Sequence, residues 1–195
     1  MPATLTKQQV DKLGNTLIYL SSRVGEFNKT KILKLLFLLD ESSIKKYGYP
    51  FLGFDYYLWQ HGPVLKEVFI DLSEELELLK DYIKRNKHDA NIYEAAKDFS
   101  DDEFSDNDIS LMDDIIKFAK NKTAKDLVDY THNENSLWQK SAIKNGVYEQ
   151  LKNKKLSYTD HTIDFLLLFE DDNVLKERYE SSLENLEFKK KLKFK

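Results

Sequence analysis

Apolar residues recur at helical spacing through most of the chain, and the pattern begins near the N-terminus. Between residues 6 and 22, apolar side chains return every three or four positions, which predicts an amphipathic helix. These positions are Val10, Leu13, Leu17, Ile18 and Leu20. The run 31–39 is apolar almost all round, which predicts a buried central helix from about residue 28 to 47. Asn28 or Thr30 can cap its start, and Gly48 suits a left-handed ending.

The middle of the chain mixes short extended pieces with further helical signals. Residues 54–59 are rich in aromatic side chains and predict a short extended segment. After Gly62 and Pro63, an amphipathic stretch through residue 79 predicts a helix with Pro63 in its first turn. Residues 80–84 and 91–93 predict the two arms of a small hairpin around a polar turn.

Helical spacing returns in the second half of the chain. It predicts a helix from Ser105 or Asp108 to about residue 119, and a short helix that Thr123 caps. Three further elements are predicted over 136–148, 159–170 and 173–186. With only 6 Gly and 3 Pro, the chain has few of the residues that form turns in many-stranded β folds. The pattern therefore predicts a mainly α-helical fold: a compact multi-helix domain with at most one small β-hairpin or short strands.

Composition narrows the class of protein and its surroundings. The chain of 195 residues has no cysteine, so disulfides, thiolate metal sites and thiol nucleophiles are excluded. A net charge of −4 does not favour direct DNA binding, and the apolar runs are too short to span a membrane. The first residues lack the basic and apolar regions of a signal peptide. We therefore expect a soluble, cytoplasmic protein that does not contact the membrane.

Three segments together resemble a known family. They are 34–40 leading to 47–50, then 54–64, and last 127–132 followed by 138–141. Their order and spacing resemble the Panacea, or SocA-like, antitoxin domain over roughly residues 6–142. The most specific feature is the aromatic strand with its Gly-Pro-Val turn and the downstream Thr-His and Trp-Gln-Lys. We accordingly divide the chain into a Panacea/SocA-like helical domain, 1–145, and a C-terminal helical extension, 146–195, packed on the same domain.

The resemblance implies a mainly helical domain of bacterial and phage toxin–antitoxin pairs, whose members neutralise different toxins by direct binding. It implies a cognate protein toxin as partner, a AAA+ protease as a further candidate partner, and a gene on a prophage or other mobile element. The sequence contains no recognisable catalytic or cofactor-binding motif, so we expect neither enzymatic activity nor a cofactor. Two alternatives stay open: a proteolytic adaptor or phage-encoded regulator that binds a host protein, and an uncharacterised hydrolase.

The motif Trp-Gln-His-Gly-Pro-Val, at the end of the aromatic segment, is the sharpest local feature. Gly62 permits a backbone conformation that other residues resist, and Pro63 restricts the chain as it leaves the turn. One interpretation is structural, with Gly62, Pro63 and Val64 forming a turn beside an aromatic plug. The other interpretation is that Trp59 and His61 contact a partner directly.

Thr131 and His132, with Trp138 downstream, form a second motif that suggests catalysis at first sight. A hydroxyl and an imidazole at a helix end commonly cap backbone groups, and nothing nearby supplies a nucleophile, base and orienting group. We therefore assign these three residues a structural role. A hydrolase would need His61 or His132 in a pocket with carboxylates. The four histidines lack metal-ligand spacing, so no metal site is expected.

An acidic run precedes the predicted helix near Ser105. Its members are Asp98, Asp101, Asp102, Glu103, Asp106 and Asp108. The run is either a patch that attracts a basic toxin or a solvated loop leading into a helix whose N-terminus favours acidic residues. For an antitoxin, the predicted contact surface combines this run with the aromatic segment. The predicted partner-binding residues are Tyr56, Tyr57, Trp59, His61, Asp101, Asp102 and Glu103.

Overall fold

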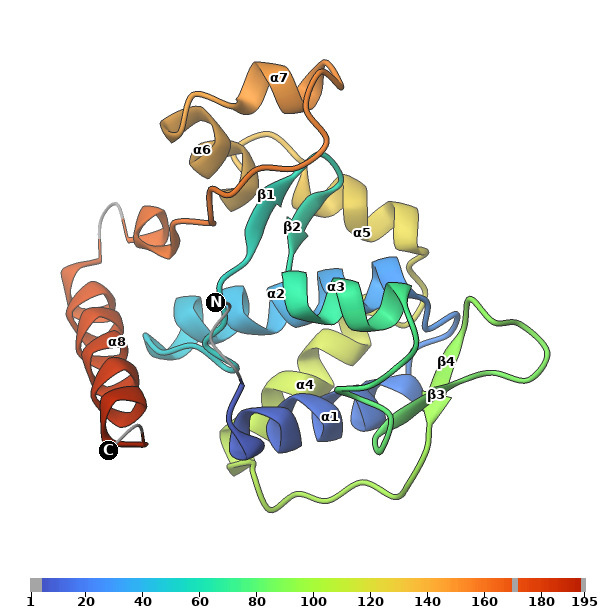
Figure 1. The fold of residues 1–195 in the computed structure, drawn as a ribbon. Helices are drawn as coiled ribbons and strands as arrows, with labels where there is room; N and C mark the ends of the chain where they lie inside the picture. The colour runs from blue at the N-terminus through green and yellow to red at the C-terminus, as the bar shows by residue number, and fades with distance from the viewer. Residues whose placement is uncertain (1–4, 170–171, 194–195) are drawn as a thin grey trace.

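Helix α2 (Lys29–Tyr47) lies at the centre of the computed structural model, which describes residues 5–169 and 172–193 (Figure 1). It contacts α3, α4, α5, α8 and β2. Every residue from 31 to 41 is buried, although the stretch includes two lysines and two acidic residues. The prediction of a buried central helix is therefore confirmed.

Both ends of α2 follow local sequence rules. Asn28 Oδ1 accepts a hydrogen bond from Lys31 N at 3.0 Å, so Asn28 is the N-cap in preference to Thr30. At the other end, Gly48 has a φ of +75°, the left-handed conformation that glycine adopts at low cost. The predicted start and end of this helix are confirmed.

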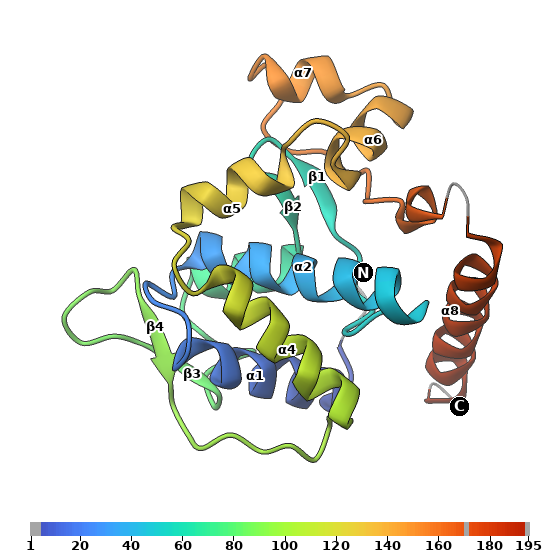
Figure 2. The same cartoon turned by 180° about the vertical axis from the view of Figure 1, so that it is seen from behind.

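The remaining helices of the main body lie on two sides of α2. They are α1 (Lys7–Ser21), α3 (Lys66–Ser73), α4 (Asp106–Ala119), α5 (Ala124–Thr131), α6 (Leu137–Lys144) and α7 (Tyr148–Lys152). In both ribbon views, α1 and α4 lie on one side of α2, whereas α5, α6 and α7 lie towards the other (Figures 1 and 2). Thr123 caps α5 as predicted, because its hydroxyl accepts a hydrogen bond from Asp126 N at 3.1 Å.

Two small antiparallel hairpins complete this body. Their strands are β1 (Tyr57–Trp59) with β2 (Gly62–Val64), and β3 (Ile83–Arg85) with β4 (Tyr93–Ala95). The mainly helical class is confirmed, and so is the hairpin predicted within residues 80–93. The β1–β2 hairpin adds a second one, where the sequence predicted only an extended segment followed by a helix.

Pro63 lies in β2 opposite Leu58, so the prediction that it begins a helix is wrong. The helix α3 begins only at Lys66. The reason is Gly62, whose φ of +97° turns the chain straight back along β1. The helix also ends before the predicted residue 79, because the Asp71 carboxylate accepts hydrogen bonds from three backbone N–H groups just beyond it and folds the chain back.

Residues 157–163 run extended beside β1, so the helix predicted over 159–170 is wrong. The hydrogen bonds are Gln60 N to Ser157 O at 2.9 Å, Leu58 N to His161 O at 2.8 Å, and Ile163 N to Tyr56 O at 2.7 Å. Pairing with the open edge of β1 overrides the helical pattern, and only the 3-10 turn η1 (Phe165–Leu168) forms. Helix α8 (Asn173–Lys193) then packs on α2. The predicted division of the chain at residue 145 stays a prediction.

Asp40 holds the loop between α2 and β1 from inside the core. Its carboxylate accepts hydrogen bonds from Leu52 N at 2.6 Å, Gly53 N at 3.2 Å and the Tyr56 hydroxyl at 2.7 Å. Burial raises the pKa of the Asp40 carboxyl, whereas these hydrogen bonds act in the opposite direction. Tyr56 is fully buried, and its hydroxyl also lies 3.0 Å from Leu36 O. Tyr56 therefore belongs to the scaffold, which corrects its prediction as a partner contact.

We expect Tyr56→Phe to lower the free energy of unfolding by about 1–3 kcal/mol, because the buried Asp40 carboxylate loses a donor. Tyr57→Phe is the matched control, since that ring is half-buried and keeps its contact with Lys66. It should change the free energy by less than about 0.5 kcal/mol. Urea unfolding followed by circular dichroism measures both, and equal effects would contradict the role given to the Tyr56 hydroxyl.

Candidate partner-binding site

Three side chains from separate helical elements hold the backbone of the β1–β2 hairpin. Each one lies within hydrogen-bond distance of a carbonyl oxygen near the turn. The pairs are Trp138 Nε1 with Trp59 O at 3.0 Å, His132 Nε2 with Gln60 O at 3.1 Å, and Lys34 Nζ with Pro63 O at 3.0 Å. We call Lys34, His132 and Trp138 the hairpin clamp. Because α2, the end of α5 and α6 each supply one member, the packing of these helices determines where the hairpin lies.

His132 links the end of α5 to the hairpin. Its Nδ1 lies 2.8 Å from Val128 O, so both ring nitrogens face backbone carbonyls, and its ring packs on Trp138 with centroids 4.2 Å apart. Burial lowers the pKa of the imidazole, whereas the contacts with the two carbonyls act in the opposite direction. The neighbouring Thr131 hydroxyl donates to Leu127 O at 3.0 Å. Both ring nitrogens of His132 therefore contact backbone carbonyls, and the Thr131 hydroxyl satisfies a carbonyl at the end of α5.

Gly62 lies between two members of the clamp. A Cβ at this position would stand 2.7 Å from Lys34 Nζ and 2.8 Å from His132 Cε1, and φ is +97°. Both the backbone conformation and the available space therefore require glycine. The absence of a side chain here lets Lys34 and His132 reach the carbonyls on either side of the turn.

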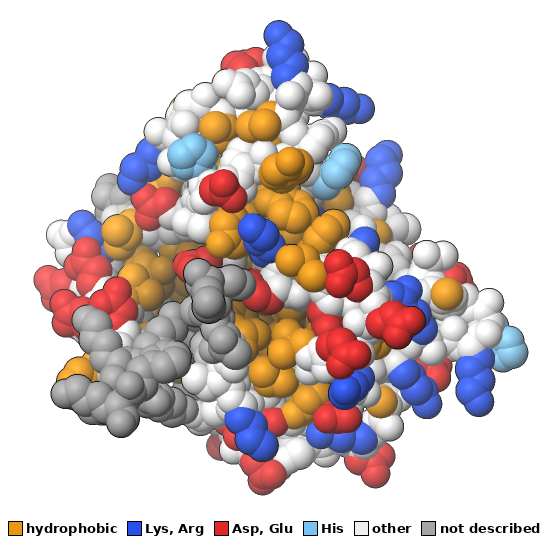
Figure 3. Space-filling model, in the orientation of Figure 1, with side chains coloured by type: hydrophobic (Ala, Val, Ile, Leu, Met, Phe, Trp, Pro, Cys, Tyr) orange, Lys and Arg blue, Asp and Glu red, His pale blue; other side chains and the backbone are white. Residues whose placement is uncertain are grey.

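A groove of about 620 Å³ opens beside the hairpin, between α2, α3 and the segment at residues 157–158. Its lining includes Leu33, Lys34, Trp59, His61, Phe69 and Tyr158. We call it the hairpin groove. Figure 3 shows hydrophobic side chains gathered at the molecular surface over β1, β2 and α3. The groove is thus a concave, largely apolar surface built on a rigidly held turn.

Aromatic rings form the walls of the hairpin groove. The half-buried Trp59 ring meets Phe69 edge-on at 4.9 Å between centroids and lies 6.2 Å from Tyr158. Tyr158 is 67% exposed, and His61 is exposed at the turn. Aromatic side chains that are packed on one side and open on the other are typical anchors of protein–protein contacts.

Lys34 is a buried amine in the wall of the groove. Its side chain is fully buried, and among the described residues it forms a hydrogen bond with Pro63 O but no ion pair. Burial lowers the pKa of the Lys34 amine to about 7. A buried cation without a carboxylate partner is costly to fold, and such perturbed groups cluster at functional sites. Lys34 is not among the site residues predicted from the sequence, although a lysine within the apolar run 31–39 was the available signal.

The structure separates the two halves of the predicted contact surface. Asp101, Asp102 and Glu103 lie in the loop before α4, on the α1 side of the molecule, where Ser100 N donates to Asn15 Oδ1. Both ribbon views place this loop at the end of the molecule away from the hairpin (Figures 1 and 2). One continuous surface combining the acidic run with Trp59 and His61 therefore does not form.

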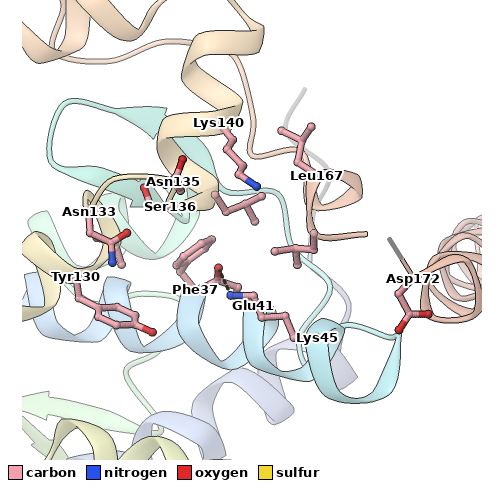
Figure 4. Close-up of a pocket in the computed structure, with 13 residues that line it drawn as sticks. Phe37, Glu41, Lys45, Tyr130, Asn133, Asn135, Ser136, Lys140, Leu167 and Asp172 are labelled. Atoms are coloured by element: carbon pink, nitrogen blue, oxygen red, sulfur yellow. Dashed lines mark hydrogen bonds and ion pairs between the residues drawn. The ribbon is translucent and has the colours of Figure 1, made fainter. Parts of the chain in front are cut away.

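A second pocket, of about 480 Å³, lies between α2, the α5–α6 connection and η1 (Figure 4). It is polar: Glu41 and Lys45 form an ion pair at 2.8 Å on its α2 side. Asn133 and Asn135 line it from the connection before α6, where Asn135 adopts a φ of +66°. Nothing in the sequence pattern predicted this pocket, because its walls come from three segments far apart in the chain.

Within residues 5–169 and 172–193, no group of three or more His, Asp or Glu side chains is arranged to hold a metal ion. Over the same residues, no helix has the length and apolar character needed to cross a bilayer.

Comparison with family models identifies the class of protein. Residues 32–139, more than half of the chain, match the model described as antitoxin SocA-like, Panacea domain, and the chain belongs to this family. The match contains the hairpin, all three members of the clamp and Phe69, whereas Tyr158 lies beyond it. Searches of curated proteins and of solved structures give no match.

We expect Gly62→Ala to lower the free energy of unfolding by about 3 kcal/mol or more, because it combines a left-handed φ with a clash against the clamp. Gly146→Ala is the control for backbone conformation alone. Gly146 has a φ of +68° but nothing within 4 Å of its Cβ position, so that variant should cost about 1–2 kcal/mol. Urea unfolding of the two variants compares them, and equal losses would argue against crowding at Gly62.

The stability of the protein should rise with pH above neutrality because of Lys34. Its amine has a pKa of about 7 when folded and an ordinary value of 10.5 when unfolded, so the unfolded chain binds more protons between these values. From pH 7 to pH 9 the free energy of unfolding should increase by about 2 kcal/mol. Urea unfolding of Lys34→Met, which lacks the titrating group, should show most of this rise removed. An unchanged slope would contradict the lowered pKa.

Proposed function

We propose that this protein is the antitoxin of a toxin–antitoxin pair, and that it neutralises a cognate toxin in the cytoplasm by direct protein–protein binding. The observation that carries the proposal is membership of the SocA-like antitoxin family over residues 32–139. The proposed contact site is the hairpin groove, with Trp59 and His61 as partner-facing residues. The proposal involves no catalytic step.

The geometry of the hairpin supports this choice of site. The clamp fixes the carbonyls on both sides of the turn, so Trp59 is held in place before a partner arrives. Preorganised anchors lose little conformational entropy on binding, which favours high affinity from a small surface. The half-packed aromatic cluster beside the groove is therefore the anchor site that we propose.

We propose that the acidic loop before α4 affects the rate of association and does not form part of the groove contact. Asp101 and Asp102 are exposed, and neither lines the groove. Charges at the rim of a contact mainly change the association rate, whereas buried aromatic anchors mainly change the dissociation rate. We therefore assign the loop to electrostatic steering of a basic toxin, and the groove to its retention.

The test is isothermal titration of the protein with the product of the adjacent gene, together with rescue of growth when both are co-expressed. We expect tight binding and rescue. Trp59→Ala should weaken the affinity by about 2 kcal/mol or more, as expected for a central aromatic anchor. Tyr130→Ala is the control, because Tyr130 is 45% exposed on α5 but does not line the groove.

Absence of both binding and rescue would refute the antitoxin proposal. Recovery of a host protein from lysate, with no toxic neighbour, would favour the alternative of an adaptor or regulator. If Asp101→Asn with Asp102→Asn slows association without changing dissociation, the steering role is supported. If that pair instead abolishes binding while Trp59→Ala has no effect, the proposed division between loop and groove is wrong.

A further inference from the structure

The hairpin groove is lined by basic side chains. They are Lys29, Lys34 and His61. The remaining lining residues are apolar, aromatic or hydroxyl-bearing, and no Asp or Glu is among them. This is unusual in a chain of net charge −4, in which carboxylates outnumber cationic side chains. The groove thus differs in sign from the molecule as a whole.

Lys34 contributes a buried amine to the lining of the groove. The amine is fully buried, and Pro63 O at 3.0 Å is its hydrogen-bond acceptor. An ammonium group carries three donors, so one carbonyl leaves it with unused capacity and without a counter-charge. Lys31, the other buried lysine of α2, differs because its Nζ binds Gly25 O and does not line the groove.

Besides a negative charge near Lys34, a ligand of the groove needs an apolar group that covers its aromatic walls. Phe69 and Trp59 meet edge-on, and the Tyr158 ring contacts Trp59 on the other side with most of its side chain exposed. A free inorganic anion would leave these aromatic faces uncovered. A peptide segment that carries an aromatic or aliphatic side chain beside a carboxylate satisfies both the rings and the amine.

We propose that the hairpin groove binds an acidic–apolar peptide segment of the partner protein. An apolar side chain of that segment packs against Trp59 and Tyr158 from the groove, and a neighbouring carboxylate pairs with Lys34. The inference rests on the proposed function in taking the partner to be the neutralised toxin. It deepens that function by specifying the chemistry of the segment that the toxin presents.

The test uses three fluorescein-labelled peptides that alternate phenylalanine with glutamate, glutamine or lysine. Fluorescence anisotropy with the full-length protein measures each Kd. We expect the glutamate peptide to bind at least about tenfold more tightly than the glutamine peptide, and the lysine peptide to bind weakest, as for a charge-assisted pair. Equal Kd values for the glutamate and glutamine peptides would overturn the inference.

Variants then assign the effect to the groove. Lys34→Met should abolish the preference for glutamate, whereas the matched variant Lys31→Met should retain it. Tyr158→Ala should weaken all phenylalanine peptides by about tenfold, and Tyr130→Ala should not. Tyr158 is too exposed for its loss to unfold the protein, so it keeps the test decisive if Lys34→Met does not fold. Retained glutamate preference in folded Lys34→Met, or unchanged binding in Tyr158→Ala, would refute the proposed site.

The two proposals fail in different ways. If the adjacent gene product does not bind but the peptides behave as expected, the antitoxin proposal fails and the chemistry of the groove stands. If that gene product binds tightly while the peptides show no charge preference, the antitoxin proposal stands and the inference about the groove fails.

Discussion

The placement of the β1–β2 hairpin depends on hydrogen bonds from side chains to backbone carbonyls. Its strands have three residues each, too few to form a stable unit alone. Trp138, His132 and Lys34 supply the missing support, each from a separate helical element. Buried carbonyls need such partners, so the hairpin and the surrounding helices stabilise one another. The groove follows from this arrangement, since Trp59 and Val64 belong to the two clamped strands.

Two buried ionisable side chains of α2, Asp40 and Lys34, differ in how fully the chain supplies their hydrogen-bond partners. Asp40 accepts three hydrogen bonds that fasten the loop before β1, so its burial is compensated within the chain. Lys34, also on α2, has a single carbonyl acceptor and no carboxylate among the described residues. A fold that required only packing would gain stability from an apolar side chain there. The acidic segment that we propose would supply the carboxylate that Lys34 lacks among the described residues.

Local rules explain which parts of the fold the sequence predicts. The course of α2 follows from an apolar run with Asn28 before it and Gly48 after it, all within one segment. Pro63 and the stretch 157–163 were predicted wrongly because their conformations depend on pairing with β1, which is a contact between distant segments. The site shows the same division: the sequence singled out Trp59 and His61, but not Lys34 or Tyr158. Only the folded chain brings these four residues to one groove.

Most of the hairpin groove lies within the residues that match the family, but Tyr158 in its outer wall does not. Residues 32–139 contain the clamp, Trp59 and Phe69, whereas Tyr158 belongs to a segment held on β1 by backbone hydrogen bonds. Backbone pairing of this kind tolerates side-chain replacement, because the N–H and C=O groups are present in nearly every residue. Substitution at Tyr158 can therefore reshape the outer wall without disturbing the hairpin clamp. If the groove binds the partner as proposed, this separation lets partner specificity change while the hairpin clamp stays the same.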